Sequence, residues 1–280
     1  MAVSLLGPLQ VDGDERLSPR DRVVLSALVI RSGDVLSAEQ LADALWGEDP
    51  PASWPKVVQG CVARLRRALG RDAVQTTGSG YRLTLTDDEI DVRRFEALVA
   101  RARALTGAGE HDRAAAVLGQ ALGLWRGTAL PDLDRWPDGR TEAGRLDELR
   151  LGAQEALLAE RAAAGRDVVA DASALVAAQP LRETRWHLLA LALYRSGRQS
   201  DALAALRQAR RTLQEELGLD PGQQLVDLER AILNHDADLV VPTATAGRDL
   251  GVCPYQGLVV YDRGDADRFF GRGDEVAACV

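Results

Sequence analysis

Hydrophobic and polar positions follow two different patterns along the chain. In the first part, short alternating stretches are mixed with short helical ones, and the loose alternation over residues 3–17 predicts a small antiparallel sheet. Over residues 91–233, apolar residues recur at helical spacing throughout, with glycines between the stretches. The pattern therefore predicts a mainly α chain, with an α+β domain over residues 1–86 and an all-α domain over residues 91–235.

Serine caps indicate two helices in the first domain. Ser18 and Pro19 suit the N-cap and the first helical position of an apolar segment that stops near Gly33. Ser37 suits the N-cap of a second helix, whose first turn includes Gln40. A turn rich in proline then leads into a third helix.

The third helix, predicted over residues 56–71, combines a narrow apolar stripe with a basic, small-residue face. The stripe consists of Val58, Val62, Leu65 and Leu69. The opposite face carries Lys56, Gln59, Gly60, Ala63 and Arg67, with Arg64 and Arg71 at its edge. Small residues let the backbone approach a ligand, and Arg and Gln donate hydrogen bonds to bases and phosphates. Such a helix can lie in the major groove of DNA.

Two short strands around a glycine turn are predicted directly after this helix, over residues 76–83. A helix followed by a hairpin is the order of a winged helix-turn-helix. An arginine-rich helix exposed to solvent would explain the helix alone, but it would not explain the hairpin. The candidate DNA-binding residues on the helix and hairpin are Lys56, Gln59, Ala63, Arg64, Arg66, Arg67, Arg71, Thr76, Thr77, Ser79, Tyr81 and Arg82.

Charge is concentrated at this candidate site. The 280-residue chain has a formal net charge of −8, yet residues 53–85 carry six basic groups against one aspartate, a net of +5. Residues 1–52 carry a net of −5. Because salt screens surface charge over roughly 10 Å, the local balance governs contact with phosphates. The overall acidity argues against non-specific nucleic-acid binding but allows a focused site.

The all-α domain contains a degenerate repeat. Its Gly-x4-Ala segments are Gly109 to Ala114, Gly165 to Ala170 and Gly197 to Ala202. The last two segments lie 32 residues apart, near the tetratricopeptide period of about 34. In such repeats the glycine separates two helices and the alanine allows them to pack closely. An insertion separates the first segment from the others, and it includes Trp125, Pro131, Trp136 and Pro137.

Several stretches resemble the Streptomyces antibiotic regulatory proteins. Residues 41–51 (LADALWGEDPP), 62–70 (VARLRRALG) and 78–83 (GSGYRL) are similar to the DNA-binding part of that family. Residues 194–203 and 213–222 are similar to its activator part. The resemblance implies an OmpR-type winged helix, like the output domain of two-component regulators, followed by a tetratricopeptide-like bacterial transcriptional activator domain.

The resemblance also implies a function. Members activate transcription in the cytoplasm and regulate secondary metabolism, including antibiotic biosynthesis. They bind direct repeats in double-stranded DNA as dimers and recruit RNA polymerase with its sigma factor. The resemblance makes Arg64 the base reader and Arg66 a phosphate contact, whereas helical geometry alone favours Arg67. One departure is Thr77, which stands where many OmpR-like wings carry an arginine aimed at the minor groove.

Patterns for catalysis, metal binding and membrane insertion are not found in the sequence. The sole lysine, Lys56, follows Pro55, so no P-loop is present. The histidines are isolated from one another, at His111, His187 and His235. The cysteines match no zinc or disulfide spacing, at Cys61, Cys253 and Cys279. No apolar run is long enough to span a membrane. We therefore expect a cytoplasmic protein that is not an enzyme and needs no cofactor or membrane.

Residues 236–250 are predicted to be a linker. Residues 251–280 resemble the lead-in to a STAND-type NTPase domain, with PYQGL and FFGRGDE segments. The chain is therefore expected to be a fragment of a longer protein, which could bind ATP. An alternative function follows, namely a helical-repeat scaffold or signalling fragment of such an ATPase whose winged helix binds protein. In that case the exposed face of residues 56–71 should be apolar or mixed, but it is basic.

Overall fold

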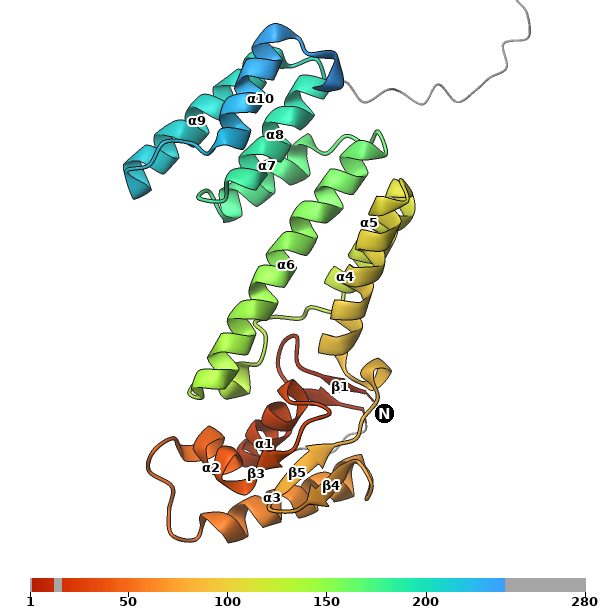
Figure 1. Ribbon diagram of the computed structural model, residues 1–280, viewed down its shortest axis with the longest axis vertical. Helices are drawn as coiled ribbons and strands as arrows, with labels where there is room; N and C mark the ends of the chain where they lie inside the picture. Colours follow the sequence, from red (N-terminus) through yellow and green to blue (C-terminus); the bar gives the residue numbers. More distant parts are fainter. Residues whose placement is uncertain (1, 13–16, 240–280) are drawn as a thin grey trace, which may run out of the picture. The chain divides into compact units, whose positions relative to one another are not determined.

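The computed structural model describes residues 2–12 and 17–239 (Figure 1). The predicted NTPase lead-in at 251–280 lies outside these residues, as does the predicted linker from residue 240 onward. The N-terminal elements are β1 (Val3–Ser4), β2 (Gln10–Val11), α1 (Pro19–Ile30), β3 (Leu36–Ser37), α2 (Ala38–Trp46), α3 (Trp54–Leu69), β4 (Val74–Thr77) and β5 (Gly80–Leu83). This is the order of a winged helix-turn-helix, in which α3 has the place of the recognition helix and β4–β5 form the wing.

The predicted wing hairpin is confirmed. Strands β4 and β5 pair antiparallel, and Gly78 makes the turn between them with φ +61°. Strand β5 is central, because β3 pairs with its other edge in the order β3-β5-β4. The third strand was not predicted. The sheet expected over residues 3–17 is a two-residue ladder of β1 with β2, so it is shorter than the alternating pattern.

Both predicted helix caps are confirmed as capping boxes. The Ser18 hydroxyl accepts from the Asp21 amide, and the Ser37 hydroxyl accepts from the Gln40 amide. In each box the side chain three residues on accepts a bond from the cap backbone in return. The two boxes set the starts of α1 and α2, which pack against α3.

Helix α3 has the predicted inner stripe. The residues Val58, Val62, Leu65 and Leu69 are all buried, and Cys61 is buried with them. The helix ends earlier than predicted, because Gly70 adopts φ +97°, which a right-handed helix does not allow. Arg71 therefore lies beyond the helix, in the turn that leads to β4.

The chain is helical from residue 91, as predicted. The elements are η1 (Asp87–Glu89), α4 (Asp91–Gly107), α5 (His111–Leu122), η2 (Pro131–Leu133), α6 (Pro137–Ala163), α7 (Val169–Ala178), α8 (Glu183–Arg195), α9 (Gln199–Leu217), α10 (Gln223–Asn234) and η3 (Ala237–Leu239). The predicted linker begins too early, because Leu239 is still bound to α8: its carbonyl accepts a 2.9 Å hydrogen bond from Arg195 Nε.

The alanine positions in the repeat are predicted correctly in two segments and wrongly in one. Ala114 and Ala202 are fully buried, whereas Ala170 is exposed and Ala172 is buried in its place. The reason is the length of the turn. Helices α5 and α9 begin two residues after their glycine, but α7 begins four residues after Gly165. In all three helices the buried alanine is the fourth residue, so the longer turn moves it by two positions.

The hydrophobic cores divide inside α6, not at the predicted domain boundary. One core extends from Val3 to Ala153 and joins the winged helix to α4, α5 and most of α6. The other begins at Leu158 and ends at Ile232. The first three helices of the all-α part therefore fold against the winged helix, and α6 belongs to both cores.

Polar contacts strengthen the first core at the N-terminal strand. The buried Asp91 carboxylate accepts bonds of 2.7 and 2.9 Å from the Leu5 amide and one of 3.0 Å from the Leu6 amide. The carbonyls of the same two residues accept from the amides of Leu130 and Arg126 at 3.0 and 2.7 Å. The insertion that interrupts the repeat is thus a packing element for the winged helix.

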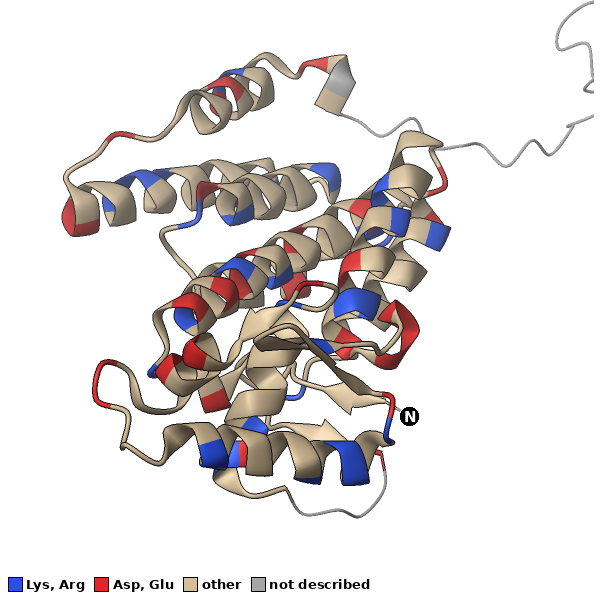
Figure 2. Cartoon of the chain, turned by 60° about the horizontal axis from the view of Figure 1, so that its bottom comes forward, with Lys and Arg blue, Asp and Glu red and all other residues tan. Residues whose placement is uncertain are grey.

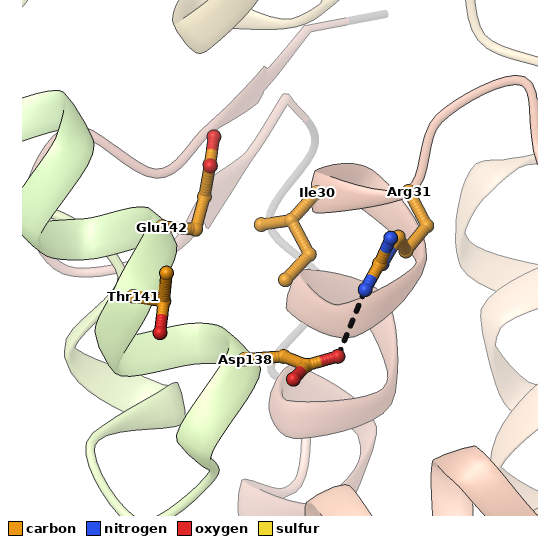
Figure 3. Close-up of a pocket in the computed structure, with 5 residues that line it drawn as sticks. All are labelled: Ile30, Arg31, Asp138, Thr141 and Glu142. Carbon is orange, nitrogen blue, oxygen red and sulfur yellow. Dashed lines mark hydrogen bonds and ion pairs between the residues drawn. The ribbon is translucent and has the colours of Figure 1, made fainter.

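Ion pairs join α1 to the same region. Arg22 binds the Asp132 carboxylate with two hydrogen bonds of 2.9 and 3.0 Å. Arg31 and Asp138 form a more exposed pair at 2.8 Å, at a cleft of about 210 Å³ between the end of α1 and the start of α6 (Figure 3). Ile30 lies over this cleft and faces Thr141. The cleft marks the joint between the winged helix and the long helix.

Candidate nucleic-acid interface

The predicted site residues lie on the outer face of α3 and on the wing. On α3 the side chains of Lys56, Gln59, Ala63, Arg64 and Arg67 are exposed, and Arg66 is half-buried. On the wing Thr76, Thr77 and Ser79 are exposed, whereas Tyr81 and Arg82 are half-buried. Figure 2 shows basic positions spaced along α3, the lowest helix of that view. The structure therefore places the predicted helix and wing residues on adjacent elements.

Arg64 is held by a buried carboxylate on α1. Its Nε donates to both Asp21 oxygens at 2.9 and 3.1 Å, and its Nη2 donates to Asp21 Oδ1 at 2.8 Å. The Arg64 side chain is 48% exposed, whereas that of Asp21 is only 2% exposed. The guanidinium therefore covers Asp21 and still reaches the surface of α3.

Hydrogen bonds keep the Asp21 carboxyl ionised in spite of its burial. Burial alone raises the pKa of Asp21, but the bonds from Arg64 and the Ser18 hydroxyl outweigh it and leave the pKa below its usual value. The neighbouring Cys61 thiol is affected in the opposite direction. Burial and the Asp21 charge raise the pKa of Cys61 to about 11, so the thiol stays protonated and unreactive.

Arg66 ties the recognition helix to the wing. Its Nε donates to the Val74 carbonyl at 2.8 Å, and its Nη2 donates to the Thr76 hydroxyl at 2.7 Å. An open groove lies here, lined also by Arg71, Asp72 and Gln75. Its two arginines outweigh the one aspartate and leave a net positive charge between the end of α3 and β4, where a phosphate backbone could pass.

Three long polar side chains on α3 keep their donors free of the protein. Lys56, Gln59 and Arg67 form no side-chain hydrogen bond or ion pair with any described residue. All three are exposed, and they lie on the same face as Ala63. Free donors beside a small residue suit direct contact with base edges.

The sequence did not reveal Asp21 and Cys61, two buried residues that accept hydrogen bonds from Arg64. Asp21 had a local signal, because it is the third residue of the helix that Ser18 caps. The contact with Arg64 had none, since 43 residues separate the two partners.

Over residues 2–12 and 17–239, no group of three or more His, Cys, Asp or Glu side chains is placed to hold a metal ion. Within the same residues, no helix has the length and apolar character needed to cross a membrane.

Two protein families match the chain along these structural parts. The family described as "Transcriptional regulatory protein, C terminal" matches residues 12–83, and "Bacterial transcriptional activator domain" matches residues 90–233. Regulatory protein DnrI of Streptomyces peucetius is 36% identical over 253 residues, which cover 84% of this chain and 93% of DnrI. The chain belongs to the Streptomyces antibiotic regulatory protein family.

Other members of this family differ in length. Regulatory protein AfsR of Streptomyces griseus is 38% identical over 245 residues, which cover 85% of this chain and 25% of AfsR. The present family member thus spans about a quarter of AfsR.

A solved structure shares the fold of this antibiotic regulatory protein family member. Mycobacterium tuberculosis EmbR, determined in complex with a low-affinity phosphopeptide, superposes with a TM-score of 0.79 at 35% sequence identity. The match covers 84% of this chain and 65% of EmbR. The arrangement of a winged helix followed by an all-α domain is therefore confirmed.

Proposed function

We propose that this protein is a sequence-specific transcriptional activator that binds direct repeats in double-stranded DNA. The observation that carries the proposal is the outer face of α3, where Lys56, Gln59 and Arg67 are exposed and have no described partner. These donors flank Ala63, which leaves room for the backbone to approach a base edge. In the proposal α3 lies in the major groove and the wing follows the phosphate backbone.

The two halves of the protein have different roles in this proposal. One protomer occupies each half-site, and the all-α part contacts the second protomer and RNA polymerase with its sigma factor. Occupancy of both half-sites raises affinity, because the second binding event becomes intramolecular. The shared core between the winged helix and α4–α6 supports this role, since it joins the DNA-binding part rigidly to the all-α part.

The wider setting of the proposal follows from the family. The protein acts in the cytoplasm, and its target genes belong to secondary metabolism. It performs no catalysis and uses no cofactor within this chain, and ATP would be bound only by a longer form.

The alternative, in which the winged helix binds another protein, is less well supported. A protein-binding face on α3 would bury apolar side chains at its centre. The exposed side chains of α3 include Lys56, Gln59 and Arg67, whereas the apolar stripe of this helix is buried.

The proposal is tested by a gel shift and a transcription assay on the DNA upstream of the protein's own gene. We expect a specific shift with that duplex, no comparable shift with a shuffled duplex, and increased run-off transcript with purified bacterial RNA polymerase. Equal binding to both duplexes would rule out sequence-specific recognition. Specific binding without any increase in transcript would restrict the protein to DNA binding and remove the activator role.

A further inference from the structure

We infer that Asp21 positions Arg64 so that Arg64 contacts a DNA phosphate through a single nitrogen, which leaves Arg67 to read the base edge. The inference rests on the proposed function and assigns roles within the same site. It departs from the family resemblance, which implies that Arg64 reads the bases, and agrees with the helical geometry of the sequence, which favours Arg67.

Most N–H groups of the Arg64 guanidinium already have a partner in the protein. A guanidinium has five of them. Two point at the Asp21 carboxylate, from Nε and Nη2, and the other hydrogen of Nη2 points at Cys61 Sγ, 3.3 Å away. Only the two N–H groups of Nη1 are then left for DNA.

Burial of Asp21 keeps Arg64 in this arrangement. Without Arg64, the carboxylate would retain only uncharged partners, namely the Ser18 hydroxyl at 2.6 Å, the Ser18 amide at 3.3 Å and the Cys61 thiol. A carboxylate that is 2% exposed and has no cation beside it is strongly unfavourable. Binding DNA by releasing Arg64 from Asp21 therefore costs more than binding it through the free nitrogen.

Glycine at position 60 keeps that free nitrogen accessible. A Cβ at Gly60 would lie 3.4 Å from Arg64 Nη1, so any larger side chain at that position would cover Nη1 on the DNA side. Gly60 follows Gln59 on the same surface of α3, close to the expected path of the DNA.

Recognition of guanine by arginine uses two parallel N–H donors, which bind O6 and N7 together. Arg64 has no such pair, because Asp21 occupies one edge of its guanidinium and Cys61 takes a donor of the other. A single charged nitrogen suits a phosphate oxygen. Arg67 has no hydrogen bond or ion pair with any described residue, so both edges of its guanidinium are free for a base.

The test uses the whole chain and two duplexes: one from the gene's own upstream region that wild type shifts, and a shuffled duplex of the same composition. Arg64→Ala should lower affinity for both by the same factor, about tenfold, and lower the salt slope by about one. Arg67→Ala should instead reduce the ratio of the two affinities, by about tenfold or more.

Lysine variants separate the two kinds of contact. Arg64→Lys should recover most of the affinity that Arg64→Ala loses, because an ammonium group also makes a single-nitrogen contact. Arg67→Lys should not recover the affinity ratio, since lysine has no fork of parallel donors.

Asp21 is tested by its coupling to Arg64. When Arg64 is present, Asp21→Asn should change the ratio of the affinities for the two duplexes by at least about fivefold. The reason is that it frees the edge of the Arg64 guanidinium that Asp21 occupies. In the Arg64→Ala variant, Asp21→Asn should leave the ratio of the two affinities unchanged. A purely structural role of Asp21 would instead change this ratio alike in both backgrounds, wild type and Arg64→Ala. Circular dichroism of each variant confirms that it is folded.

Three results would overturn the inference. If Arg64→Ala reduces the affinity ratio as much as Arg67→Ala does, Arg64 reads bases, and the proposed function still stands. If Asp21→Asn acts equally in both backgrounds, Asp21 does not position Arg64. If wild type binds both duplexes equally, the proposed function fails and this inference fails with it.

Discussion

The indole nitrogen of Trp136 donates a 2.9 Å hydrogen bond to the carboxylate of Asp43. Trp136 belongs to the insertion between α5 and α6 and is 3% exposed, whereas Asp43 lies on α2. Helix α2 packs against the recognition helix α3. The all-α part is therefore bonded directly to the helix-turn-helix motif that supports the candidate DNA interface.

This bond predicts a difference between two tryptophan variants. Trp136→Phe should lower the free energy of unfolding by about 1 kcal/mol more than Trp125→Phe does. Trp125 is the control for the indole nitrogen, because that nitrogen is buried and has no hydrogen-bond partner in the described part of the chain. The Arg150 guanidinium lies over the Trp125 ring, and a phenylalanine ring can still make that contact. Urea unfolding of the two variants measures the difference, and equal losses would mean that the Asp43 bond adds nothing to stability.

The shared core predicts where the chain can be cut. A fragment of residues 1–90 should not unfold cooperatively, because Leu5, Leu6 and Ile90 lose the α4–α6 side chains that cover them. Each such residue contributes about 1.5–3 kcal/mol when buried, and a whole domain has only about 5–15 kcal/mol to lose. Residues 1–163 keep this core and should unfold cooperatively in urea. A cooperative transition for residues 1–90 would contradict the shared core.

The glutamates around Arg182 allow a matched comparison of a buried and an exposed ion pair. Glu155 accepts from Arg182 at 2.7 Å and from the fully buried Arg185 at 3.0 Å, whereas Glu148 accepts from Arg182 at 2.8 Å with 67% of its side chain exposed. Glu155→Gln should cost about 3–5 kcal/mol of unfolding free energy, because it leaves Arg185 without its charge partner. Glu148→Gln should cost less than about 1 kcal/mol.

The stability difference between wild type and Glu155→Gln should depend on pH. Burial raises the pKa of Glu155, but Arg182 and Arg185 outweigh it and hold the pKa below its usual value. The unfolded chain therefore binds more protons than the folded one as pH falls below about 4.3, and stability falls with it. The stability gap between wild type and Glu155→Gln should narrow from pH 7 to pH 3.5. A constant gap in urea unfolding would show that the charge of Glu155 is not responsible.

Two glycines of the wing should respond differently to substitution. A Cβ on Gly80 would collide with the Leu36 carbonyl oxygen and lie 2.7 Å from Val35 Cγ1, whereas a Cβ on Gly78 meets nothing. Gly80→Ala should lower the free energy of unfolding by about 1–3 kcal/mol, because β3 must separate from β5, and should weaken DNA binding. Gly78→Asn is the control, since asparagine tolerates the left-handed conformation at φ +61°. Equal stability of the two variants would contradict the close packing of β3 on β5.

Local signals were sufficient to predict the recognition motif. The caps at Ser18 and Ser37, and the inner stripe of α3 that includes Val58, each depend on neighbours three or four residues apart. Periodicity and capping detect such relationships directly. The wing was predicted for the same reason, because Gly78 lies between two strands that are adjacent in sequence.

Features that depend on distant parts of the chain could not be predicted in this way. The pair of Asp21 with Arg64 joins two helices, and β3 is a two-residue strand that exists only through its pairing with β5. The buried alanine of the second repeat segment depends on the length of the turn after Gly165, which spacing alone does not reveal. The division of the cores inside α6 depends on how an insertion packs onto Leu5 and Leu6, which precede it by more than 100 residues.

Selection from a random duplex library, followed by sequencing of the bound DNA, tests the central claim most directly. We expect enrichment of two half-sites in the same orientation, with centres separated by about 10.5 base pairs or a multiple of that distance. The Arg67→Ala variant should still bind DNA, but the DNA that it selects should be much less enriched in these half-sites. Bound DNA with no common sequence in wild type would contradict the claim that α3 reads a specific site.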